Sequence, residues 1–198
     1  MASLFQTLSV AVLFLCAVGI LLVKNWRWMT GLLALQYIGV LGLVSISWPV
    51  EIAVVKLIAG WMAAAVLFLT YVNIPDSSAE MQSELNFPGI FFRGFTALLI
   101  GLSMYSLVPV ALRWFLGATH QQTLGGLLLL GLGLLQLGLS REAIRIVIGV
   151  LTVISGFEIL YATLEASVLM TGLLAILNIG IAFVGAYLLL ASYLEETS

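Results

Sequence analysis

Charged side chains are scarce in this sequence: 7 Lys and Arg residues and 9 Asp and Glu residues make up 8% of its 198 positions. A soluble domain carries roughly 25% charged residues, so the composition excludes a soluble fold. The formal net charge of -2 provides no basic surface for a nucleic acid. No polar stretch longer than residues 73–89 is available to build a domain outside a membrane. Any catalysis would therefore have to occur inside the bilayer.

Side chains that ligate metals are also rare. The single cysteine, Cys16, lies in an apolar run, which excludes an intramolecular disulfide and a cysteine-ligated cluster or zinc site. The single histidine, His120, is expected in a loop outside the membrane, with no cysteine or histidine partner. The sequence therefore predicts no metal site and no cofactor.

Apolar residues are abundant, at 63% of the chain. One helical crossing of a bilayer uses about 20 residues. The apolar runs predict seven transmembrane helices, at residues 4–23, 28–48, 52–72, 90–110, 124–139, 144–164 and 167–190. The first run has no basic residue before it and no cleavage signal after it, so we interpret it as a retained helix. The expected fold is all-α, a polytopic membrane helix bundle.

The expected helices are arranged as three, one and three. In each triplet a basic loop joins the first two helices, so that residues 24–27 correspond to 140–145, and Gly31 corresponds to Gly149. One helix separates the triplets, so both begin on the same side and the weak repeat is parallel. The sequence predicts three units. Residues 1–72 form a first three-helix unit, residues 73–123 form an acidic linker with the fourth helix and an outer loop, and residues 124–198 form a second three-helix unit. Within the linker, the proline-bearing stretch 73–89 predicts a surface loop or a short interfacial helix.

Basic residues indicate how the bundle is oriented. One face collects Lys24, Arg27, Arg93, Arg141 and Arg145, whereas the other has only Arg113. Loops on the cytoplasmic side of a membrane carry an excess of Lys and Arg. We therefore expect an integral protein of the cell (inner) membrane, with its N-terminus outside and its C-terminus in the cytoplasm. Lys24, Arg27, Arg141 and Arg145 are then basic residues of cytoplasmic loops.

Two ionisable residues, Lys56 and Glu158, lie inside expected membrane helices. Such residues are expensive in a bilayer and mark functional sites by default. Glu158 lies past the midplane towards the outer face, and Lys56 lies about one turn from that same face. The two side chains could therefore pair and form a proton relay. In the alternative, Lys56 reaches to the interface and Glu158 is protonated or hydrogen-bonded to Tyr161 or Ser155.

Uncharged polar residues extend this set of candidates. Thr152, Ser155 and Glu158 recur every three residues and form a stripe that could line a hydrated path, although helix packing explains the hydroxyls better. Gln36 and Asn178 lie near mid-membrane, and Gln136 lies nearer the cytoplasmic end; such amides more often join helices than bind substrate. The candidates for an ion pathway are Glu158, Lys56, Gln36, Asn178, Ser155 and Tyr161.

Three short segments carry a resemblance to a known family. The run Val-Lys-Asn-Trp-Arg at residues 23–27 is followed by Gly31, Ala34 and Gln36, with Leu-Thr-Tyr at 69–71 and Leu-Ser-Arg-Glu-Ala-Ile-Arg-Ile-Val-Ile-Gly at 139–149. Together they resemble hydrogenase-4 component E, a membrane subunit of complex-I-like energy-converting hydrogenases. The last three helices are similar to the K subunit of NADH-quinone oxidoreductase and the C subunit of multisubunit cation antiporters.

This resemblance implies a non-catalytic membrane-arm subunit that supports proton or sodium translocation. It also implies partners: antiporter-like subunits, and K-like, quinone-module or hydrogenase-module subunits. The ionisable positions differ from the family pattern. The chain has Leu151 where the K subunit carries a carboxylate, and component E carries its carboxylate near Ile154. The last-helix carboxylate of the K subunit has no acidic counterpart here, and Asn178 is the nearest polar residue. Component E places its lysine deeper in the third helix than Lys56.

Two other functions remain open from the sequence. A self-contained small ion or solute transporter could use the parallel triplets and the Lys56 and Glu158 pair as its pathway. A purely structural membrane spacer would need only the helix packing.

Overall fold

The computed structural model describes residues 2–73, 87–115 and 117–197, and within these ranges it contains seven helices and no strand. The helices are α1 (Ala2–Leu22), α2 (Trp26–Val44), α3 (Val50–Val72), α5 (Phe87–Trp114), α6 (His120–Leu139), α7 (Ala143–Tyr161) and α8 (Val168–Thr197). All seven are long and apolar enough to cross a membrane. The predicted all-α membrane bundle is confirmed.

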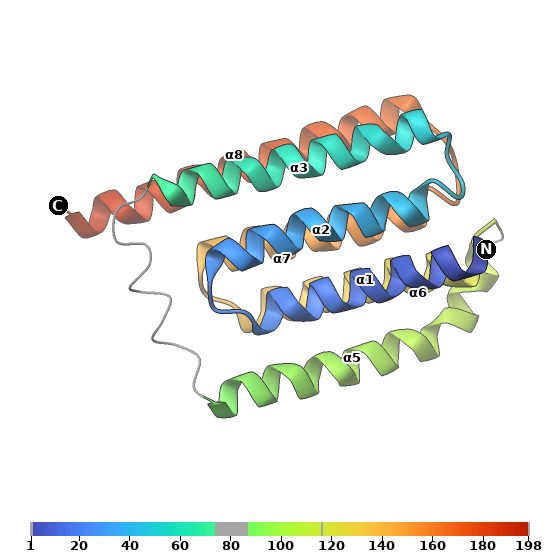
Figure 1. Cartoon of the computed structure of the whole chain (residues 1–198), viewed down its shortest axis with the longest axis horizontal. Helices are drawn as coiled ribbons and strands as arrows, with labels where there is room; N and C mark the ends of the chain where they lie inside the picture. Colours follow the sequence, from blue (N-terminus) through green and yellow to red (C-terminus); the bar gives the residue numbers. More distant parts are fainter. Residues whose placement is uncertain (1, 74–86, 116, 198) are drawn as a thin grey trace.

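The six helices of the two triplets form two layers (Figure 1). One layer contains α1, α2 and α3, and the other contains α6, α7 and α8. Helix α1 packs on α6, α2 on α7, and α3 on α8, so each helix contacts the corresponding helix of the other triplet. Helix α5 lies at the edge, against α6 and α1. The two chain ends lie at opposite ends of the bundle, as an odd number of crossings requires (Figure 1).

Helices α6 and α7 approach closely along a seam of glycines. A Cβ atom added to Gly156 would lie 2.7 Å from the carbonyl oxygen of Gly126, and one added to Gly133 would lie 3.1 Å from that of Gly149. Side chains larger than hydrogen would separate the two backbones, so these glycines set the spacing of the two helices. Not every glycine of α6 contributes to this seam, since a Cβ atom added to Gly138 would have no neighbour within 4 Å.

Helix α6 begins at His120 and not at Leu124, so the prediction that His120 lies in a loop was wrong. Thr119 and Gln122 form a capping box at this end, in which each side chain binds the backbone of the other residue. This cap satisfies amide groups that the start of a helix leaves unpaired, and it extends the helix beyond its apolar run. The predicted helix at residues 124–139 therefore begins four residues earlier, at His120.

Other helix ends also differ from the expected ones. Helix α2 ends at Val44, before the predicted residue 48, and α7 ends at Tyr161, before 164. Helix α5 continues through Pro109 to Trp114, because neighbouring groups can compensate for proline in membrane helices. Of the expected surface segment 73–89, residues 74–86 lie outside the part of the chain that the structure describes.

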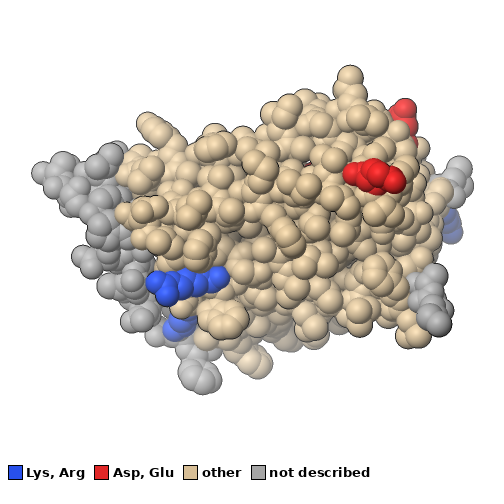
Figure 2. All heavy atoms as spheres, turned by 45° about the horizontal axis from the view of Figure 1, so that its top comes forward, with Lys and Arg blue, Asp and Glu red and all other residues tan. Residues whose placement is uncertain are grey.

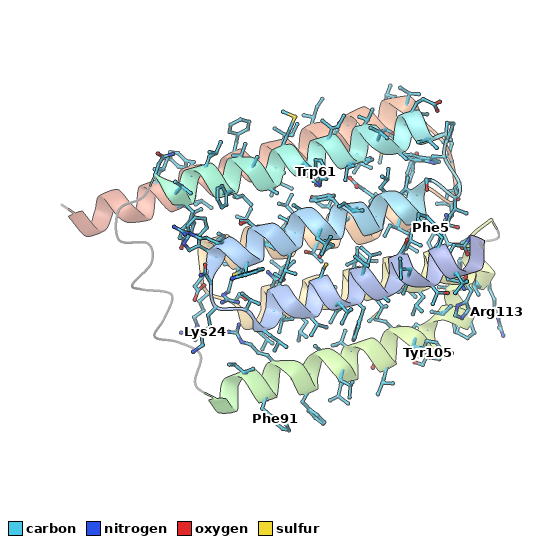
Figure 3. All side chains as sticks on the ribbon, viewed as in Figure 1. Phe5, Lys24, Trp61, Phe91, Tyr105 and Arg113 are labelled. Carbon is cyan, nitrogen blue, oxygen red and sulfur yellow. The ribbon has the colours of Figure 1, made fainter. Side chains whose placement is uncertain are left out.

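The exterior of the bundle is apolar and its charges lie at the ends. On the face drawn in Figure 2, the Lys, Arg, Asp and Glu atoms of the described residues lie near its two ends, and its broad middle has none. Figure 3 places Lys24 at one end and Arg113 at the other. We call the end that carries Lys24 the basic end and the opposite one the N-terminal end. An apolar belt between two charged ends is the surface that a bilayer requires.

Candidate functional site: a buried ion pair between three helices

Lys56 and Glu158 meet in the interior of the bundle. The distance from Lys56 Nζ to Glu158 Oε1 is 2.7 Å, and each side chain is only 1% exposed. Lys56 lies in the second turn of α3, and Glu158 lies in the last turn of α7. Because α3 begins and α7 ends at the N-terminal end, these positions have a similar depth. The sequence left open whether the two residues pair, and the structure shows that they do.

Asn178 of α8 completes the contact. Its Nδ2 atom donates a hydrogen bond of 3.0 Å to Glu158 Oε1, the same oxygen that binds Lys56. Three helices from both layers, α3, α7 and α8, are therefore joined at one carboxylate oxygen. The expectation that Asn178 joins helices is confirmed.

Tyr37 of α2 forms another wall of the site. Its side chain is buried, and its hydroxyl lies near Ser155 and Glu158. The ring has room because residue 60 of α3 is glycine: a Cβ atom there would overlap ring atoms of Tyr37. Gly60 lies one turn after Lys56, so the same stretch of α3 supplies the ammonium group and the space for the ring.

The polar stripe of α7 continues from Glu158 towards mid-membrane. Thr152 accepts a hydrogen bond of 3.4 Å from Gln36 Nε2, which links α2 to α7. Thr152 and Ser155 donate to the carbonyl oxygens of Ile148 and Leu151 in their own helix. The hydroxyls therefore do bond back to α7, as the packing interpretation predicted, but their oxygens still face the polar side chains of α2.

Four buried polar atoms of this cluster have no hydrogen-bond partner among the described residues: Gln36 Oε1, Tyr37 OH, Glu158 Oε2 and Asn178 Oδ1. Burying such a group unpaired costs about 1–3 kcal/mol, so a fold that only needed tight packing would use apolar side chains here. Each of the four atoms can accept a hydrogen bond. Chemically, the site contains a carboxylate with one oxygen on an ammonium group and the other free to accept a proton or a hydrogen bond.

The polar stripe stops short of the basic end. Leu33, Ile148 and Leu151 belong to one buried apolar cluster between Thr152 and the first turn of α7. Arg145 lies about 10 Å from Thr152 along α7, towards the basic end. Its surroundings are quite different. Within the described residues, the polar stripe of α7 that begins at Glu158 therefore stops at Thr152.

Arg145 was expected in a cytoplasmic loop, and this prediction was wrong. The residue lies in the first turn of α7 and its side chain is 2% exposed. Its guanidinium group binds Glu142 Oε2 at 2.8 Å and the carbonyl oxygen of Val23 at 2.9 Å, while Gln136 donates to its backbone carbonyl. Arg145 therefore connects α7 to the end of α1, where free carbonyl groups attract a cation.

The other candidates lie apart from the ion pair. Tyr161 stacks on Phe157, with ring centroids 6.0 Å apart, and makes no hydrogen bond to Glu158. Lys24 and Arg141 lie in the loops at the basic end, and Arg27 lies in the first turn of α2. No group of three or more His, Cys, Asp or Glu side chains comes together within the described ranges.

Comparison with protein-family models, with curated proteins and with solved structures finds no match to this chain.

Sequence reasoning missed Tyr37. Trp and Tyr residues of membrane helices are expected at the two interfaces, but Tyr37 lies deep within α2. That position next to Gln36 was the available signal, since a buried tyrosine needs a partner for its hydroxyl.

Proposed function

We propose that this chain is an integral membrane subunit of a complex-I-like respiratory or energy-converting hydrogenase complex. In this proposal the Lys56–Glu158 pair takes part in moving protons or sodium ions across the membrane. The observation that carries it is the ion pair itself, whose two side chains are each only 1% exposed inside a bundle of seven helices that are apolar enough to cross a membrane. The resemblance of residues 23–36, 69–71 and 139–149 to hydrogenase-4 component E supports the choice of complex.

Stability alone does not account for the pair. Removing two charges from water costs several kcal/mol per ion, and well-packed apolar residues often replace a buried pair with no loss of stability. A lysine and a glutamate at hydrogen-bond distance can exchange a proton, and Glu158 Oε2 is free to pass it on. The neighbouring polar side chains of Tyr37, Asn178 and Ser155 can rearrange their hydrogen bonds when such a proton transfer changes the charges of the pair.

The incomplete polar stripe favours a subunit over a self-contained transporter. Apolar side chains close the path between Thr152 and the basic end, so an ion that reaches Glu158 needs a route through another subunit. Antiporter-like and K-like or quinone- or hydrogenase-module subunits are the partners that this proposal requires. It places the chain in the cell (inner) membrane, with the N-terminus outside and the basic end in the cytoplasm, because Lys24, Arg27 and Arg141 lie at that end.

The test has two steps. The tagged protein is purified in a mild detergent, and the accompanying proteins are identified by mass spectrometry. The purified complex is then placed in liposomes, where ion pumping and electron transfer are measured for the wild type and for Glu158→Gln. Glu165→Gln is the matched control, because Glu165 is an exposed acid near the same end of α7.

We expect antiporter-like partners, and a loss of pumping in Glu158→Gln that Glu165→Gln does not show. Recovery of the chain alone across several gentle detergents, with a flux that Glu158→Gln abolishes, would replace the subunit by an independent transporter. Full pumping in a complex with the double variant Lys56→Met and Glu158→Leu would leave only a spacer role.

A further inference from the structure

A groove runs along the outside of the bundle between α2 and α3. Its volume is about 270 Å³, and its floor is formed by small residues of both helices, among them Gly31, Ala34 and Ala65. Arg27 lines the groove at the basic end, and Trp61 lines it towards mid-membrane. The groove is separate from the buried ion pair, so its role does not depend on the proposed function.

The groove is closed in the middle of the membrane. The indole Nε1 atom of Trp61 donates a hydrogen bond of 3.0 Å to the carbonyl oxygen of Ala34, although Trp61 is 46% exposed. From Arg27 to Ala34 the groove extends about 10 Å along α2, well within half of a hydrocarbon core of about 30 Å. A partner helix that crosses the bilayer would need a longer contact, whereas a lipid chain of one leaflet fits this length.

The charge at the mouth of the groove indicates which lipid headgroup would bind there. The Arg27 guanidinium lies 5.3 Å from the ring centroid of Trp26, and no carboxylate pairs with it among the described residues. Two other arginines at this end, Arg93 and Arg145, bind backbone carbonyls within the bundle. Arg27 is exposed at the mouth of an apolar groove, and a guanidinium group binds phosphate oxygens well.

We propose that the α2–α3 groove binds an anionic phospholipid. The phosphate contacts Arg27, and one acyl chain lies over Gly31 and Ala65 as far as the Trp61 indole. Basic pockets between membrane helices recognise anionic lipid headgroups in this way.

The test measures lipid binding by native mass spectrometry of the purified protein, with added phosphatidylglycerol or phosphatidylcholine of identical acyl chains. Arg27→Gln removes the headgroup contact, and Arg141→Gln is its control, because Arg141 is exposed at the same end but does not line the groove. Gly31→Leu fills the groove, and Gly138→Leu is its control. A Cβ atom at either glycine meets nothing within 4 Å, so neither substitution begins with a steric clash at Cβ.

We expect phosphatidylglycerol to bind more strongly than phosphatidylcholine. Arg27→Gln should weaken its binding about fivefold, the contribution of one basic side chain near a membrane surface, and Gly31→Leu should weaken the binding of both lipids. Equal effects of Arg27→Gln and Arg141→Gln, or no effect of Gly31→Leu, would overturn the proposal. So would a photo-crosslinker at Ala65 that captures a polypeptide in native membranes instead of a lipid.

Discussion

The ring of Tyr37 occupies the space into which a side chain at position 60 would project. A Cβ atom on Gly60 would overlap three atoms of that ring. One glycine on α3 therefore makes room for an aromatic side chain on α2, whose hydroxyl lies near Glu158 of α7. Packing and ion-pair geometry are thus linked through two residues.

Gly60→Ala should lower the stability of the folded protein by about 1–3 kcal/mol, the usual effect of overpacking a core. Thermal unfolding in detergent measures this change. Gly180→Ala on α8 is the control, since its added Cβ atom meets nothing within 4 Å. Equal melting temperatures for the two variants would contradict the close Tyr37–Gly60 contact.

Lys56→Met should be strongly destabilising, by about 3–5 kcal/mol, because it leaves the carboxylate of Glu158 buried without its cation. The double variant Lys56→Met and Glu158→Leu should recover most of this loss, since it buries no charge. Unfolding of both single variants and the double variant gives the coupling energy between the residues. Additive effects would show that the two side chains do not interact in the membrane.

Gly156→Ala should destabilise the bundle more than Gly138→Ala. The added methyl group meets the backbone of α6, with the Gly126 oxygen and the Leu130 nitrogen both 2.7 Å away. Backbone atoms cannot move aside as a flexible side chain can, so α6 and α7 must separate. The melting temperatures of the two alanine variants test this, and a tolerated Gly156→Ala would contradict the direct backbone contact.

The orientation of the bundle can be tested by cysteine labelling. Cys16 is buried and is first replaced by alanine, and then Arg141→Cys or Ala166→Cys introduces an exposed thiol at either end of α7. A membrane-impermeant maleimide should label residue 166 in intact cells and residue 141 only after the membrane is opened. The reverse pattern would place the basic end outside.

The depth of the site could be predicted from the sequence, but its lateral arrangement could not. Counting residues from the helix ends placed Lys56 and Glu158 at a similar depth because the rise per residue of a helix is fixed. The packing of α8 against both α3 and α7, which brings Asn178 and Lys56 to Glu158, depends on helices that are apolar around most of their surface and therefore give little distinguishing pattern.

Two errors have a related cause. His120 was placed in a loop and Arg145 at the cytoplasmic surface, because both lie at or near the end of an apolar run. The Thr119–Gln122 capping box extends α6, and the carbonyl oxygen of Val23 binds the Arg145 guanidinium inside the bundle. Hydropathy measures transfer from water to an apolar phase, so it does not include such specific hydrogen bonds.

The glycine seam between α6 and α7 limits how the backbone beside the ion pair can move. Gly156 precedes Glu158 by two residues, so the carboxylate is attached where two backbones touch and neither helix can slide without the other. The ammonium group of Lys56 is at the end of a four-carbon chain with many accessible rotamers. A change in the length of this ion pair therefore requires rotation of one of its two side chains, or movement of α3, and not sliding of α7 along α6.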